Sequence, residues 1–265
     1  MTAGNDVFRL EEGTGWMRGL NNLLDAELGR WYRTRRWWVQ ILVWAAIINL
    51  ILLMVAVSEE SANAVDLVML FNVFMGIFAA VGVCIIMQGT IVREKQDGTA
   101  AWVLSKPASR QAFLLAKLIA NSIGIIVTIV LVQGAIAYAI ISLASGTTLS
   151  LPAYLAGLGI HIVNLFFYIT LTLMLGALFN NRGIVIGLPL VFLFAQQFLI
   201  GLVPTLADFL PFTLTVPLND SSYPSIATAV MTGEAVPTVM PVLTTLGFSI
   251  LFVAIGLWAF EREEL

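Results

Sequence analysis

Six long apolar runs are the feature that most limits the folds open to this chain. About 20 apolar residues, each rising about 1.5 Å, cross a hydrocarbon core of about 30 Å, so each run is long enough for a transmembrane helix. Hydrophobic residues make up 59% of the 265 residues and charged residues only 11%, whereas a soluble domain carries about 25% charged residues. The sequence therefore predicts an all-α integral membrane protein. The six predicted spans are Trp37–Val57, Val65–Ile91, Phe113–Leu143, Tyr154–Phe179, Ile184–Val203 and Val242–Phe260.

A charged island, residues 93–117, separates the second run from the third. Gly98 interrupts it, residues 100–104 form a short apolar patch, and Pro107 ends that patch. Ser109 has the residue type of an N-cap for the helix that follows. We expect a short helix at the membrane surface that can pass a push from the cytosol into the membrane. The basic residues of the island are Arg93, Lys95, Lys106, Arg110 and Lys117.

The Lys and Arg residues fall on one side of the predicted membrane. Of the 13, six precede the first run, five lie in the island, and the other two are Arg182 and Arg262. The remaining three loops contain no Lys or Arg. Their charged residues are all acidic and include Glu59, Glu60, Asp66, Asp208, Asp220 and Glu234. Because cytoplasmic loops are enriched in Lys and Arg, we expect both termini and the island on the cytoplasmic side of a multi-pass protein.

Residues 16–36 have the pattern of an amphipathic helix that lies in the membrane interface. Leu20, Leu24, Leu28 and Trp31 recur at helical spacing, and most of the intervening residues are polar or charged. The other interpretation is an ordinary basic cluster beside the first span. In the first interpretation the interfacial residues are Arg30, Trp31, Arg33, Arg35 and Arg36.

The outer connection, residues 204–241, is long, apolar and rich in proline. Connections of this length usually are functional or contain short helices of their own. We expect short helices that dip into the outer leaflet, with a solvated loop as the alternative.

Most catalytic chemistry is absent from the sequence. No lysine follows a glycine, so the chain has no G-x4-G-K-[ST] phosphate loop. His161 is the only histidine and Cys84 the only cysteine, so neither a His-cluster nor a Cys-based metal site can form, and no catalytic set such as a Ser-His-Asp triad is visible. We therefore expect a non-catalytic membrane subunit that binds no metal or cofactor.

One face of the fourth predicted span is polar. His161, Asn164, Tyr168 and Thr172 follow one another at helical spacing. His161, Asn164 and Tyr168 are candidates for the lining of a substrate path. The alternative is hydrogen bonding between helices, at about 0.6 kcal/mol per contact.

The island carries a family resemblance. Glu94, Gly98-Thr99, Leu104, Pro107, Ser109-Arg110 and Lys117 follow the pattern E-x3-G-T-x4-L-x2-P-x-S-R-x6-K. This pattern resembles the loop between the second and third spans of ABC-2 type transporter permeases. The match covers about a tenth of the chain, and the six-span layout extends the likeness to nearly all of it. The ending FEREEL also resembles that family, although Glu263 stands where a basic residue is more frequent.

The resemblance implies a permease subunit of an ATP-binding cassette exporter in the cytoplasmic membrane of a prokaryote. Residues 1–36 would form a cytosolic tail and elbow helix, and residues 37–265 the transmembrane domain, with a coupling segment at 93–110 and an outer loop at 204–241. Re-entrant helices of that loop would close the outer mouth of the path.

The resemblance also implies partners. They are two cytosolic ATPase subunits holding ATP and Mg²⁺, a second permease copy or a paralogue, and membrane lipids; no nucleic acid is expected. We expect Trp102, Val103 and Leu104 to contact the ATPase, while Glu94 and Arg110 hold the angle of the short helix by charge pairing. Anchoring at the membrane interface is the other role open to Trp102. The expected coupling residues are Glu94, Gly98, Thr99, Trp102, Val103, Leu104, Pro107 and Arg110.

Two other functions remain open from the sequence. An ABC-2 type subunit could transmit force to an extracytoplasmic partner, or help it mature, rather than move bulk cargo. An intramembrane enzyme or channel unrelated to ATPases is disfavoured because no catalytic set is present and the island would have no purpose.

Overall fold

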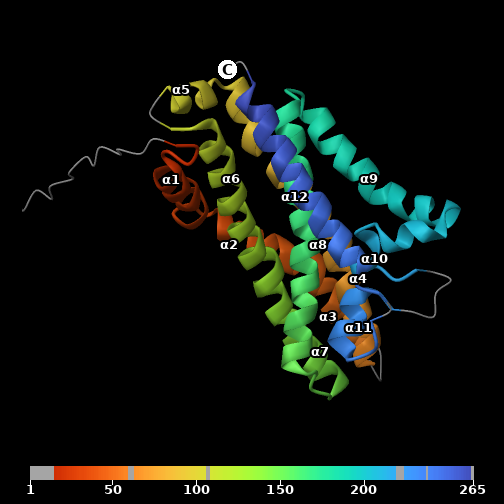
Figure 1. Ribbon diagram of the computed structural model, residues 1–265. Coiled ribbons are helices and arrows are strands. Elements are labelled where there is room, and N and C mark those ends of the chain that lie inside the picture. The colour runs from red at the N-terminus through yellow and green to blue at the C-terminus, as the bar shows by residue number, and fades with distance from the viewer. Residues whose placement is uncertain (1–14, 59–62, 106–107, 219–223, 237, 264–265) are drawn as a thin grey trace, which may run out of the picture.

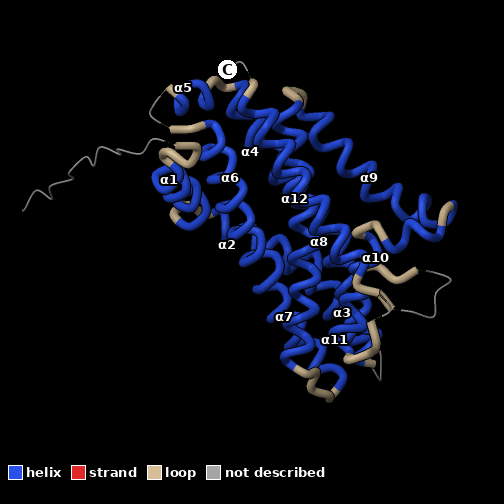
Figure 2. The backbone as a smooth tube through the Cα atoms, in the orientation of Figure 1, coloured by secondary structure: helices blue, strands red, loops and turns tan. Residues whose placement is uncertain are grey.

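The computed structural model describes residues 15–58, 63–105, 108–218, 224–236 and 238–263. Helices and short loops make up this part of the chain, and it contains no strand (Figures 1 and 2). The prediction of an all-α membrane protein is confirmed.

Six helical segments are long and apolar enough to cross a membrane. The first, Trp37–Ser58, comprises most of α2 (Arg36–Trp44), the π-helical η1 (Ala45–Asn49) and α3 (Leu50–Ser58). The third, Arg110–Ser145, comprises α6 (Arg110–Ile125), the π-helical η2 (Ile126–Leu131) and α7 (Val132–Ser145). The other four are single helices: α4 (Ala64–Gln96), α8 (Leu151–Leu178), α9 (Arg182–Leu202) and α12 (Met240–Glu261).

The helix α4 continues into the charged island. Its 33 residues span about 50 Å at a rise of about 1.5 Å, well over the core thickness of about 30 Å. It ends at Gln96 rather than at Ile91, the end predicted for the second span, so Arg93 and Lys95 form its last turn. Two short helices lie at this end of the bundle: α1 (Leu20–Tyr32), which packs beside α6, and α5 (Thr99–Leu104), which lies near the C-terminus (Figure 1).

The helix α8 forms the centre of the bundle. In its most apolar stretch 61% of the residues are buried, compared with 17% for α12 and 28% for α9. Figure 1 shows α8 beside α4 and α12, and α9 at the upper right, where it packs on α4 and α8 with much of its surface exposed. Surfaces of α9 and α12 are therefore left for lipid or for another chain.

Gln133 joins the first and third spans where both become π-helical. Its Nε2 donates to Ile41 O at 3.1 Å and to Thr128 O at 3.0 Å, and its Oε1 accepts from Asn49 Nδ2 at 2.7 Å. Ile41 O also accepts from Ala45 N, so the amide adds a second hydrogen bond there. The buried Gln133 side chain therefore links the two spans beside their π-helical segments.

The outer connection forms short helices that pack among the spans. These are η3 (Pro204–Asp208), α10 (Phe212–Thr215) and α11 (Ile226–Thr232). Phe212 N donates to Gln196 Oε1 at 3.1 Å, six residues before the end of α9. Asn72 Nδ2 of α4 donates to Thr228 Oγ1 of α11 at 2.9 Å. Residues 219–223 and 237 lie outside the described part of the chain.

The contact of α10 with α4 depends on a glycine. A Cβ on Gly76 would lie 2.1 Å from Thr215 Oγ1 and 2.5 Å from Thr215 Cβ. We expect Gly76→Ala to lower the free energy of unfolding in detergent by about 1–3 kcal/mol, the usual cost of overpacking. Gly187→Ala on α9 is the control, because its added Cβ would meet nothing within 4 Å. Equal stability of the two variants would contradict this packing.

Candidate functional site

Four charged side chains connect α1, α4 and α6 at the island end of the bundle. Lys117 Nζ of α6 lies 2.8 Å from Glu27 Oε1 of α1 and 2.8 Å from Glu94 Oε1 of α4. Arg30 Nη1 of α1 lies 3.0 Å from the same Glu27 oxygen and 2.6 Å from the same Glu94 oxygen. Each carboxylate therefore contacts both cations. We call this set, Glu27, Arg30, Glu94 and Lys117, the charge network.

Three of the four side chains of the charge network are shielded from water, while that of Arg30 is 50% exposed. The Lys117 side chain is 1% exposed, and those of Glu94 and Glu27 are 13% and 14% exposed. Burial by itself lowers the pKa of Arg30, but the hydrogen bond to Glu94 and the charges of both carboxylates raise this pKa above its ordinary value. An isolated buried charge is costly, whereas two cations shared between two carboxylates neutralise one another. The network therefore holds three helices in one arrangement.

Trp31 fixes the position of α1 on α6. Its ring lies where a Cβ on Gly124 would stand, and its Nε1 donates to Asn121 Oδ1 at 3.1 Å. Trp31 is 2% exposed, so its ring packs against α6 instead of facing the surroundings. Arg33 is exposed at the end of α1, and the side chain of Arg36 lies outside the described residues.

The short helix α5 presents Trp102 to its surroundings. Gly98 begins it with a φ of 68°, a left-handed conformation that favours glycine. Trp102 is 62% exposed, whereas Val103 and Leu104 are half-buried against the core of this chain. Of the three residues expected to contact an ATPase, Trp102 is therefore the most accessible. Ser109 caps α6 as predicted, because Ala112 N donates to its Oγ at 3.0 Å. Pro107 lies outside the described residues.

The two charges that flank α5 do not pair with it. Glu94 belongs to the charge network, and Arg110 donates to the backbone oxygens of Glu261 and Glu263 near the C-terminus. Lys95 Nζ lies 2.8 Å from Glu263 Oε1 and 3.1 Å from Ala177 O. Glu94 therefore pairs with charges of α1 and α6, whereas Arg110 bonds to backbone oxygens; that these contacts set the angle of α5 stays a prediction. Both residues tie neighbouring helices together.

A recess of about 830 Å³ opens beside the charge network. Its walls come from the end of α1, the start of α2, the last third of α4, and Lys117 and Asn121 of α6; Thr99 of α5 and Arg182 of α9 complete it. We call it the α1–α4 recess. It joins the expected coupling segment to the expected elbow, which lie far apart in the sequence.

The candidate path-lining residues serve a different purpose. His161, Asn164 and Tyr168 are 0%, 2% and 1% exposed. A His161 ring nitrogen lies 2.7 Å from Asn72 Oδ1, and Tyr168 OH accepts from Gln196 Nε2 at 2.8 Å. Asn164 Nδ2 donates weakly to Gly76 O at 3.4 Å. These contacts correspond to the alternative interpretation, hydrogen bonding between helices, and they hold the outer short helices in place.

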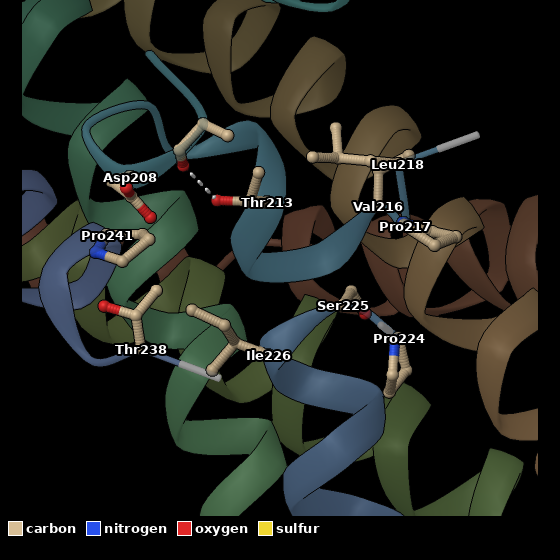
Figure 3. A pocket seen from close by; sticks show the side chains of 11 residues that line it. Asp208, Thr213, Val216, Pro217, Leu218, Pro224, Ser225, Ile226, Thr238 and Pro241 are labelled. Carbon is tan, nitrogen blue, oxygen red and sulfur yellow. Dashed lines mark hydrogen bonds between the residues drawn. The ribbon is translucent and has the colours of Figure 1, made fainter. Parts of the chain in front are cut away.

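A second cavity, of about 160 Å³, lies among the outer short helices. Figure 3 shows Asp208 and Pro241 on one side of it, Ile226 and Ser225 below, and Val216 and Pro217 opposite. The Thr213 hydroxyl, at its upper edge, donates to Ala207 O at 2.9 Å. Within the described residues no group of three His, Cys, Asp or Glu side chains could hold a metal ion.

Sequence reasoning missed the charge network. Glu94 and Lys117 are both part of the island pattern, but their 23-residue separation gives no indication that they meet. Glu27 lies in the amphipathic segment, where an acidic residue looks solvated. The one available signal was Lys117 itself, since a lysine placed past the first two turns of a membrane helix needs a buried partner.

Removal of Lys117 tests the charge network. Lys117→Met would leave two adjacent carboxylates with only Arg30 between them. We expect the free energy of unfolding in detergent to fall by about 3–5 kcal/mol, the usual effect of breaking a buried ion pair. Arg93→Met is the control, because the Arg93–Asp97 pair is exposed and should contribute about 1 kcal/mol or less. If Lys117→Met were as stable as Arg93→Met, the network would not hold the helices together.

Comparison with known proteins identifies the family of this chain but gives no function for it. No curated protein matches the chain. Residues 38–265 match a family described as a protein of unknown function, DUF2705, and this match covers all six spans, α5 and the outer short helices. The chain therefore belongs to the DUF2705 family.

Proposed function

We propose that this chain is the membrane-spanning permease subunit of an ATP-binding cassette exporter in a prokaryotic cytoplasmic membrane. The chain itself holds no nucleotide; a separate cytosolic ATPase supplies ATP hydrolysis. Two permease subunits, identical or paralogous, and two ATPase subunits form the working complex.

The observation that carries the proposal is the connection between α5 and the charge network. The exposed Trp102 gives α5 an apolar contact for a soluble partner, and α5 follows α4 after only Asp97 and Gly98. Glu94, at the end of α4, is in turn bound to Arg30 of α1 and Lys117 of α6. A push on α5 therefore reaches three helices through short, charged contacts. Transmission of force requires such rigid connections between elements.

The α1–α4 recess supports a transport role. It lies on the same side of the molecule as α5 and is lined by the ends of several helices. One six-span chain encloses only part of a path, and the exposed faces of α9 and α12 leave room for a second copy. Movement of the helices held by the charge network would change the width of the recess.

The distribution of charge supports a cytoplasmic location of α5. Arg30, Arg93, Arg110, Arg182 and Arg262 lie at the end of the bundle that carries α5 and the C-terminus. The opposite ends of the helices carry Asp66, Asp208 and Glu234.

Cysteine labelling of intact cells tests this orientation. In a Cys84→Ala background, which removes the one buried thiol, a cysteine replaces either Ser105 near α5 or Thr148 in the opposite loop; both positions are exposed. We expect an impermeant maleimide to label Thr148→Cys and to spare Ser105→Cys until the cells are opened. The reverse pattern would contradict the orientation.

Loss of Trp102 tests the coupling role. We expect Trp102→Ala to weaken the affinity for an ABC-type ATPase by about 30-fold, because truncating a central aromatic contact typically costs about 2 kcal/mol or more. Trp38→Ala removes another exposed tryptophan and should leave this affinity unchanged. The measurement is co-purification with the tagged chain from its own cells, with the ATPase identified by its Walker motifs in mass spectrometry.

Leu104→Ala separates docking from stability. Leu104 packs against this chain, so its loss should reduce thermal stability more than ATPase binding. A wild-type complex without an ABC-type ATPase, or one that survives Trp102→Ala intact, would contradict the proposed coupling.

A further inference from the structure

The α1–α4 recess has a net positive charge after its internal pairs are counted. In the charge network two carboxylates neutralise two cations, and Arg93 Nε pairs with Asp97 Oδ2 at 3.4 Å. Two further lining cations, Arg35 and Arg182, have no carboxylate within ion-pair distance in the described part of the chain. Arg182 Nε donates to the neutral Gln96 Oε1 at 3.1 Å. An anion is therefore the complementary ligand.

The recess changes from charged to apolar along the helices that form it. On α4, Ile85 and Ile86 precede Arg93 by eight and seven residues, or about 10–12 Å along the helix axis. On α2, Val39 lies about one turn beyond Arg35. Ile85 and Val39 are 52% and 54% exposed although both line the recess. The cations thus lie at the membrane surface, and an apolar wall continues toward the membrane interior.

A buried acceptor lies between these two levels. Gln88 Oε1 is inaccessible to solvent and has no hydrogen-bond partner among the described residues, and Gln88 lines the recess. It precedes Arg93 by five residues, about 7 Å. Buried acceptors normally receive a hydrogen bond. Because this oxygen is closed to solvent, it adds no direct contact for a ligand in the recess.

We propose that the α1–α4 recess binds one anionic phospholipid from the adjoining leaflet, with its phosphate at Arg35 and Arg182 and one acyl chain along Val39 and Ile85. A charged head group above a hydrocarbon tail matches the cations of the recess followed by its apolar wall. Basic pockets between helices at the positively charged membrane side are typical sites for anionic lipid heads. The carboxylates of the charge network do not oppose this ligand because Arg30 and Lys117 already neutralise them. The site requires only the transmembrane position of these helices, not an ATPase partner.

Native mass spectrometry of the delipidated full chain in detergent tests the site. The probes are phosphatidylglycerol and phosphatidylcholine with identical acyl chains, each titrated separately. We expect the wild type to bind the first phosphatidylglycerol about 30-fold more tightly than phosphatidylcholine, because each basic side chain near an anionic lipid contributes roughly 1 kcal/mol. The double variant Arg35→Gln/Arg182→Gln should lose this preference and bind both lipids alike.

The control variant is Arg18→Gln/Arg33→Gln. It removes the same charge from two exposed arginines of the same membrane side that do not line the recess, and it should keep the preference. Equal binding of both lipids by the wild type, or equal loss in both double variants, would overturn the proposal in favour of general surface attraction. Displacement of phosphatidylglycerol by millimolar inorganic phosphate would also overturn it, because the site would then recognise a free anion rather than a lipid.

Discussion

The burial of Lys117 is the constraint on which the arrangement of the helices at the island end of the bundle depends. An ammonium group in a dry environment must have counter-charges, and Lys117 finds them on two helices that are distant in sequence, at Glu27 and Glu94. Arg30 then contacts the same two carboxylates, so the four charges form a closed set. Because Lys117 is buried and can be neutralised only while both carboxylates stay beside it, α1, α4 and α6 are held together at this end.

At the other end of the bundle, hydrogen bonds between neutral side chains hold the helices together. The apolar faces of the spans give little preference for one another over lipid, so hydrogen bonds and close glycine contacts decide which helices meet. Gln196, Asn72 and His161 position α10 and α11, and Gln133 supplies a donor to carbonyls at the π-helical segments. Of these residues, His161 was a candidate for a path from the sequence, but its buried hydrogen bond to Asn72 gives it a structural role.

The island end combines three properties within one small region. It carries the exposed tryptophan of α5, the closed charge network and the open α1–α4 recess. A soluble partner at α5 and a ligand in the recess would both act on the same three helices. The C-terminal residues join this region as well, through Arg110 and Lys95, which connects α12 to the island.

The sequence alone determined the number of spans, the helical class, the break at Gly98 and the cap at Ser109, because each follows from local hydrophobicity or from the conformation of one residue. It also indicated short helices in the outer connection. The tertiary structure decided which side chains meet. Trp31 packs on Gly124 instead of facing the surroundings, and Val103 and Leu104 turn partly into the core. Glu94, which precedes α5 in the chain, bonds to Lys117 of α6 and Arg30 of α1. Periodicity assigns a residue to a face of its own helix, but only the packing of the helices determines which neighbour that face contacts.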